Sequence, residues 1–189
     1  MAGQEGDPRP GRRYEGAVLA PGASTGEHWT LVETERAVAD RLDGLVLDMP
    51  AMAVVQNLYR AAGAIRNHLE RSVLGPHGLT WTGWVVLWVV WIWTEIEARH
   101  VAAEAGISKG TLTGVLSTLE SRGLLARRTH PDDARRVLVA LTDRGERLMS
   151  ELFPVFNGQE AVVTAPLAPD ERVRLADLLR TVVRGLDRS

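Results

Sequence analysis

The segment from Glu97 to Gly145 constrains the fold most, because its turn and cap residues divide it into short pieces of fixed type. Gly106 suits the left-handed conformation that ends a first helix. Ser108 suits the N-cap of a second helix. Apolar residues then recur on one face at helical spacing, at Leu112, Val115, Leu116 and Leu119. Gly123 ends this run, so the pattern predicts two helices joined by a tight turn.

The other face of the second helix is small and polar. It holds Lys109, Gly110, Thr111, Thr113, Gly114, Ser117, Ser121 and Arg122. Two glycines in a helix interior cost roughly 1 kcal/mol each relative to alanine, so helix stability does not explain this composition. Small side chains let a helix approach a polar surface such as a groove of DNA, where hydroxyls and Lys109 suit phosphates and base edges. An ordinary solvated helix face is the alternative.

A two-stranded hairpin is predicted next. Residues 124–129 read as a strand that ends in Arg127 and Arg128, the letters HPDDA turn the chain, and residues 136–141 read as a second strand. The second strand places Val137, Val139 and Leu141 on one face. Two helices followed by a hairpin with a basic tip predict a winged helix-turn-helix, which favours sequence reading on DNA.

Asp133 and Arg135 form a candidate pair beside the turn. At a spacing of two residues the carboxylate can orient the guanidinium, and a planar cation held in this way fits the narrow minor groove of DNA. The alternative is a surface ion pair of very little energetic value.

Residues 94–147 resemble the winged helix-turn-helix of the MarR family of bacterial transcription regulators. GISKGTLTGVLSTLESRGLL resembles the family's recognition helix and its exit, DARRVLVALT resembles the wing with its Asp-x-Arg, and LTDRG resembles the Leu-Thr-x-x-Gly that opens the following helix. The resemblance implies that Arg135 enters the minor groove and that the recognition helix faces the major groove. Gly110 departs from the proline often seen at its position. The candidate DNA-binding residues are Ser108, Lys109, Gly110, Thr111, Thr113, Ser117, Arg127, Asp133 and Arg135.

Charge and composition limit the alternatives. The 189 residues carry a net charge of -2, so DNA affinity has to come from a local patch. From Ser108 to Arg136 there are six basic and three acidic residues, a local +3, whereas the first 48 residues hold five arginines and nine acids, a local -4.

Cysteine is absent, which excludes disulfides, thiolate metal sites and thiol oxidation as a signal. Lys109 is the single lysine among 22 basic residues, which hints at a bacterium with GC-rich coding.

No chemistry of catalysis stands out. The five histidines lie far apart without a helical pair, so no metal site is predicted. No Ser/His/Asp order, phosphate-binding glycine loop or carboxylate pair is present. We expect neither an enzyme nor a cofactor, and the absence of a signal sequence predicts a cytoplasmic protein without membrane contact.

The predicted fold class is mainly α with a small β-hairpin wing, a winged helix-turn-helix plus a helical dimerisation region. Residues 1–26 read as a flexible tail and 27–48 as an accessory N-terminal helix; 49–79 and 143–189 are expected to form the helical dimerisation region, and 80–142 the DNA-binding domain. Thr142 suits the cap of a helix that Pro154 should kink or end.

The last helix should begin at Pro169 and Asp170. Its narrow apolar seam consists of Leu175, Leu179, Val182 and Leu186, and such a seam usually meets a partner helix. The resemblance implies a homodimer whose terminal helices interleave. Its two recognition helices would then lie about one DNA turn, roughly 34 Å, apart and read a pseudopalindromic operator in double-stranded DNA.

Residues 79–93 hold five of the six tryptophans. Trp81, Trp84, Trp88 and Trp91 share one helical face, and valine and leucine cover the rest, which predicts a helix buried all round. The segment is too short to span a membrane, which takes about 20 apolar residues. A bulky core is the favoured interpretation, and a cleft for a small aromatic effector at Trp84 and Trp88 is the alternative.

The predicted function is a sequence-specific, homodimeric DNA-binding transcription regulator, a repressor released by a small aromatic ligand. The alternative is a winged-helix module that binds protein and does not bind DNA. Salt dependence separates the two, because phosphate contacts release counterions.

Overall fold

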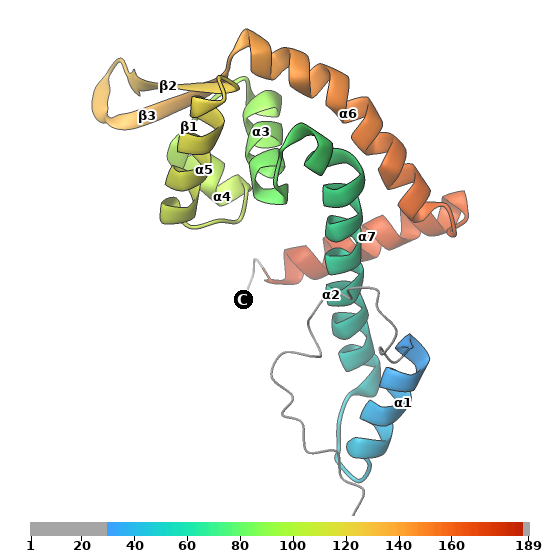
Figure 1. Cartoon of the computed structure of the whole chain (residues 1–189). Coiled ribbons are helices and arrows are strands. Elements are labelled where there is room, and N and C mark those ends of the chain that lie inside the picture. Colours follow the sequence, from blue (N-terminus) through green and yellow to red (C-terminus); the bar gives the residue numbers. More distant parts are fainter. Residues whose placement is uncertain (1–29, 187–189) are drawn as a thin grey trace, which may run out of the picture. The chain divides into compact units, whose positions relative to one another are not determined.

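The computed structural model describes residues 30–186, and the chain divides into two compact units with the boundary between Asn67 and His68 (Figure 1). The predicted flexible tail, residues 1–26, lies outside the described residues. The first unit contains α1 (Leu31–Arg41) and most of α2 (Met49–Leu69). The second unit begins at the end of α2 and contains every other element.

In the first unit, α1 forms where the accessory helix was expected. Thr30 caps it: the Thr30 hydroxyl accepts from the backbone N–H of Glu33 at 3.2 Å, and the Glu33 carboxylate accepts from the backbone N–H of Thr30. Asn57 of α2 donates to Glu35 of α1 at 3.2 Å. None of the side chains described between Thr30 and Asn67 is buried, so this helix pair has no core of its own.

The second unit is the larger one. It continues from α2 through η1 (Glu70–Leu74), η2 (Gly75–His77), α3 (Trp81–Trp93), β1 (Glu95–Glu97), α4 (Ala98–Glu104), α5 (Lys109–Ser121), β2 (Leu125–His130), β3 (Asp133–Leu141), α6 (Asp143–Thr164) and α7 (Pro169–Leu186). The three strands form one antiparallel sheet in the order β1-β3-β2. At the letters GPHG the chain turns through η2 and Gly78, which has a left-handed backbone conformation.

The turn and cap predictions around α5 are confirmed. Gly106 and Gly123 both have positive φ, 63° and 67°. The Ser108 hydroxyl accepts from the backbone N–H of Thr111 at 3.1 Å, as an N-cap should. The apolar face of α5 packs inward, with Leu112, Leu116 and Leu119 buried and Val115 half-buried.

The tryptophan helix α3 is the centre of the second unit's core. Val86, Leu87 and Val90 are fully buried, and the tryptophan face packs against α6. Ring centroids lie 4.5 Å apart for Trp84 and Phe156 and 4.7 Å apart for Trp88 and Phe153, both stacked. The expectation of burial all round fails at the C-terminal end, where Ile92 and Trp93 are 53% and 59% exposed, because the helix runs past the elements that cover it.

The sequence missed one strand, overextended one apolar face and left open whether Pro154 kinks or ends its helix. The strand β1 was not predicted, because three residues are too few to show an alternating pattern. The apolar face of β3 does not extend to the tip: Val139 is buried, but Val137 is 38% exposed, since the β2–β3 hairpin projects beyond the helices (Figure 1). Pro154 was expected to kink or end its helix; the helix does not end there, and α6 continues to Thr164.

The start of α6 is fixed by a close contact. Thr142 caps the helix, and its hydroxyl donates to the carbonyl of Gly123 at 2.6 Å. A Cβ atom on Gly145 would lie 2.0 Å from the carbonyl oxygen of Leu124 and 3.0 Å from its carbonyl carbon. Only glycine fits there, which explains the glycine of the Leu-Thr-x-x-Gly sequence.

The last helix, α7, begins at Pro169 as predicted. None of its residues is buried, and the seam residues Leu175, Leu179, Val182 and Leu186 are all exposed. Among the described residues, no single helix has both the length and the apolar character needed to cross a membrane; one bent pair, Met49–His77 with Trp81–Trp93, passes that test on length and composition.

Candidate nucleic-acid interface

The outward face of α5 presents all six residues predicted from this helix. Ser108, Lys109, Gly110, Thr111, Thr113 and Ser117 are exposed. The first turn also leaves backbone N–H groups near solvent, and the helix dipole adds partial positive charge there. The face therefore offers donors, acceptors and one cation at the end of the helix that suits anions.

The hydroxyls on this face differ in the hydrogen-bonding capacity that their internal hydrogen bonds leave unused. Thr113 donates to the carbonyl of Lys109 at 2.9 Å, and Ser108 and Thr111 share a hydrogen bond of 2.9 Å. Thr113 therefore keeps acceptor capacity only. Within the described residues, the Ser117 hydroxyl has no partner, so it can donate and accept. The face can thus address both acceptor and donor groups on base edges.

The two helix glycines have open space around them. A Cβ atom on Gly114 would meet nothing within 4 Å, and one on Gly110 would meet only the Ser108 hydroxyl, at 3.8 Å. Internal packing therefore does not require glycine at either position. Each glycine lowers helix stability, and no contact among the described residues compensates for that loss.

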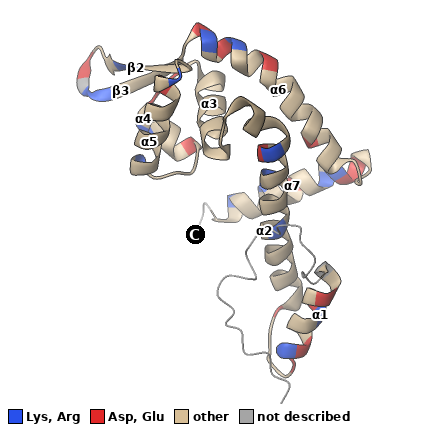
Figure 2. Cartoon of the chain, viewed as in Figure 1, with Lys and Arg blue, Asp and Glu red and all other residues tan. Residues whose placement is uncertain are grey.

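The wing tip carries the predicted pair in the predicted geometry. Asp133 accepts from the backbone N–H of Arg135 at 3.0 Å and from its guanidinium Nε at 3.2 Å. These two bonds hold the pKa of Asp133 below its ordinary value, so the carboxylate stays charged. The Arg135 side chain is 90% exposed, and Figure 2 shows acidic and basic residues together at the hairpin tip. The arginine is oriented at its base and free at its end.

Sequence reasoning missed two glutamates on β1. In the sheet register, Glu95 and Glu97 lie on the same face as Arg128 and Arg136. Glu95 receives two hydrogen bonds from Arg128, at 2.8 and 2.6 Å. Glu97 accepts from Arg136, which holds the pKa of Glu97 down at about 2. The root of the wing is thereby bonded to β1, and only an alternation within the letters EIE could have pointed to it.

Glu97 is also bonded outside the sheet. Its second carboxylate oxygen lies 3.0 Å from Nε of Arg99 on α4. Among the described residues it is the only buried charged side chain. Two arginines therefore compensate the cost of taking this carboxylate out of water.

Arg127 lies on the opposite face of the sheet, toward α5. It lines a cleft of about 230 Å³ between α4, α5 and the wing, together with Ala98, Arg99, Lys109, Leu112, Thr113, Leu116 and Val137. Its guanidinium donates to Glu120 near the end of α5, through Nε at 3.0 Å and also through Nη2. The structure thus places Arg127 beside α5 but bonded to a carboxylate.

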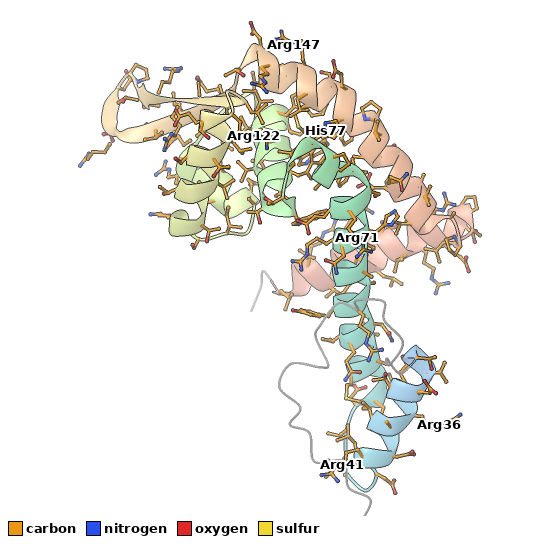
Figure 3. All side chains as sticks on the ribbon, viewed as in Figure 1. Arg36, Arg41, Arg71, His77, Arg122 and Arg147 are labelled. Carbon is orange, nitrogen blue, oxygen red and sulfur yellow. The ribbon has the colours of Figure 1, made fainter. Side chains whose placement is uncertain are left out.

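Arg122 has an internal role instead of a surface one. Its guanidinium donates to the backbone carbonyls of His77 and Gly78, both at 2.7 Å. Arg122 and His77 are labelled in Figure 3. The C-terminal end of α5 is therefore fixed to the turn that precedes α3.

The candidate effector residues Trp84 and Trp88 lie in the packing layer between α3 and α6. Trp84 is only 4% exposed, and Phe156 stacks on it. Trp88 stacks on Phe153, and its neighbour Trp91 donates to Glu146 at 2.9 Å. The core interpretation accounts for these contacts. Figure 2 shows no charged residue on α3.

The chain is similar to known proteins over residues 79–137 and, for one relative, over most of its length. The model of the MarR family matches residues 79–137. The HTH-type transcriptional regulator YwaE of Bacillus subtilis (strain 168) is 33% identical over 160 residues, 85% of this chain and 91% of the relative. The chain belongs to the MarR family. This relative and the family are transcription regulators and not enzymes, so the chain is a DNA-binding transcription regulator.

Solved structures of MarR-like regulators share the fold. BpsR of Bordetella bronchiseptica, whose DNA binding is regulated by 6-hydroxynicotinic acid, has 31% identity and a TM-score of 0.64, over 69% of this chain and 98% of BpsR. NadR in complex with 4-hydroxyphenylacetate has 27% identity and a TM-score of 0.58, over 67% of this chain and 89% of NadR. The predicted family and fold class are therefore confirmed.

Proposed function

We propose that this MarR-family regulator is a homodimeric repressor that binds a pseudopalindromic operator and is released by a small aromatic ligand. The observation that carries the DNA part is the outward face of α5. It has exposed hydroxyls, one cation and two glycines without an internal packing role. In this proposal, Ser108, Lys109, Gly110, Thr111, Thr113 and Ser117 approach the major groove, and Arg135, oriented by Asp133, enters the minor groove.

The homodimer is supported by α7. Its apolar seam runs along the helix and is exposed, which is costly for a helix in isolation and ordinary for one that meets a second copy. We assign residues 49–79 and 143–189 to dimerisation and residues 80–142 to DNA binding. Two copies would present two recognition helices to successive turns of one DNA face.

The aromatic ligand is supported by the relatives. BpsR responds to 6-hydroxynicotinic acid and NadR binds 4-hydroxyphenylacetate, both hydroxylated aromatic acids. In this chain a flat ligand near Trp84 and Trp88 would take the stacking positions of Phe156 and Phe153. Such an exchange would separate α3 from α6 and so shift the lobe that carries α5.

Three variants test the DNA part. Arg135→Ala should lower affinity for every duplex and flatten its salt dependence by about one counterion per subunit, whereas Thr113→Ala and Ser117→Ala should change sequence preference. Arg36→Ala removes the same charge from α1, outside residues 80–142, and should leave the affinity, its salt dependence and the sequence preference unchanged. Binding is measured by fluorescence anisotropy against salt, on fragments selected from the source genome. Wild-type protein without salt-sensitive duplex binding would favour the protein-interaction module.

Gly114→Ala tests the close approach directly. It should stabilise α5 by roughly 0.5–1 kcal/mol, because alanine is the better helix former, and yet weaken operator binding. Thermal unfolding and anisotropy measure the two effects on one variant. Improved stability with unchanged affinity would show that nothing approaches the backbone there.

The ligand part is tested separately by titrating hydroxylated aromatic acids against the protein. Tryptophan emission should change, and operator affinity should fall over the same concentration range. A series that alters neither signal would leave the tryptophans as core only.

A further inference from the structure

Glu120 and Arg127 form an ion pair at the edge of the cleft between α5 and the wing. The pair joins the last turns of α5 to β2 and involves two guanidinium nitrogens on one carboxylate oxygen. Arg127 holds the pKa of Glu120 below its ordinary value, so the carboxylate remains charged at neutral pH. The pair is therefore present under the conditions in which the regulator meets DNA.

The pair is poorly placed to stabilise the fold. The side chains of Arg127 and Glu120 are 34% and 38% exposed, and an ion pair this open to water contributes little to stability. The wing is already bonded to β1 on its other face, through Arg128 to Glu95 and through Arg136 to Glu97. The Glu120 pair thus needs a role other than attaching the wing.

The position of Arg127 indicates that role. It lines the same cleft as Lys109 and Thr113, which lie on the face that we assign to the major groove. Within the described residues, Lys109 has no acidic partner, whereas Arg127 does. A phosphate that approaches the cleft meets one free cation, Lys109, and two paired ones, Arg99 with Glu97 and Arg127 with Glu120.

We propose that Glu120 is a specificity-determining residue that withholds Arg127 from non-cognate DNA. The inference rests on the proposed DNA-binding role. On an arbitrary sequence a phosphate has to displace Glu120 and gains little, so Arg127 stays paired. On the operator, contacts of α5 with base edges fix the DNA backbone against the cleft, and Arg127 transfers from Glu120 to the aligned phosphate.

The test compares Glu120→Gln with Glu104→Gln, which removes the same charge from the exposed end of α4. A mixed-sequence duplex and an operator fragment are titrated at several salt concentrations. Glu120→Gln should bind the mixed duplex several-fold more tightly, with a log–log salt slope steeper by about 0.9 per subunit. Operator affinity should rise less, so the ratio of the two affinities falls. Glu104→Gln should retain the wild-type slopes.

The double variant Glu120→Gln/Arg127→Gln identifies the cation responsible. It should return the mixed-duplex slope to the wild-type value, because the released charge is gone. An unchanged slope for Glu120→Gln, equal slope changes for both glutamate variants, or weaker operator binding with a normal circular dichroism spectrum would each overturn the proposal. Wild-type protein without salt-dependent binding would instead refute the DNA-binding role itself.

Discussion

The helices α3 and α7 belong to the same unit and are both rich in apolar residues, but only α3 buries its apolar residues within this chain. Val86, Leu87 and Val90 of α3 are fully buried, and its tryptophans stack on α6, whereas no residue of α7 is buried. The difference separates two kinds of hydrophobic sequence. A helix that is apolar all round is buried in the core of its own chain. A helix with a narrow apolar seam and an otherwise polar surface is typical of packing against a partner helix.

The largest effect on this comparison is expected at Trp84. Replacing Trp84 by alanine removes a stacked ring from the core and should destabilise the protein by about 3–5 kcal/mol. Urea unfolding measures the change. Trp93→Ala at the exposed end of α3 is the matched control and should cost far less. Similar losses at both positions would contradict the assignment of Trp84 to the core.

The second effect concerns α7. Leu179→Gln/Val182→Gln should leave the fold intact but dissociate the proposed homodimer, lowering operator affinity by on the order of 100-fold as the two sites become independent. Sedimentation and anisotropy provide the readouts. Arg184→Gln on the opposite side of the helix should remain dimeric. Retention of the dimer by the double variant would show that the seam is not the interface.

The third effect distinguishes two glycines of α6. Gly145→Ala would drive a Cβ against the Leu124 carbonyl and should destabilise the protein by roughly 1–3 kcal/mol. Gly158 has nothing within 4 Å, so Gly158→Ala should be stabilising by about 0.5–1 kcal/mol. Unfolding midpoints of the two variants should therefore move in opposite directions, and shifts of the same sign would refute the packing argument.

The smallest expected effect is a pH dependence of folding stability that arises from Glu97. The folded-state pKa of Glu97 is about 2, against an ordinary value of 4.5, so its contribution to stability is present above pH 4.5 and is lost as the pH falls toward 2. Glu97→Gln should lower stability at pH 7 and reduce the loss of stability between pH 4.5 and 2. Denaturation midpoints across that range give the answer; parallel curves for the two proteins would show that the carboxylate does not contribute.

Local signals in the sequence were sufficient for the recognition helix and the last helix. Ser108, Gly106 and Gly123 act through caps and backbone conformation, which depend on neighbouring residues only, and Pro169 opens α7 in the same local way. The seam of α7 was equally legible, because helical period is a property of the segment itself.

What could not be predicted depends on tertiary contacts. Six cations were counted between Ser108 and Arg136, but Arg122 bonds to backbone carbonyls and Arg127 to Glu120. Glu95 and Glu97 act on arginines more than 30 residues away in the chain. Charge counting along a sequence overstates the cations available to DNA when the fold bonds them to other elements. The continuation of α6 through Pro154 is equally a matter of context, since Phe153 and Phe156 on either side of it pack onto α3.

The two bonds from Arg122 to the carbonyls of His77 and Gly78 have a mechanical consequence. They attach the C-terminal end of α5 directly to the turn before α3. If that turn moved, the pull would act on α5 at its C-terminal end, and a given change in the direction of the helix axis would displace Lys109, at the opposite end, the most.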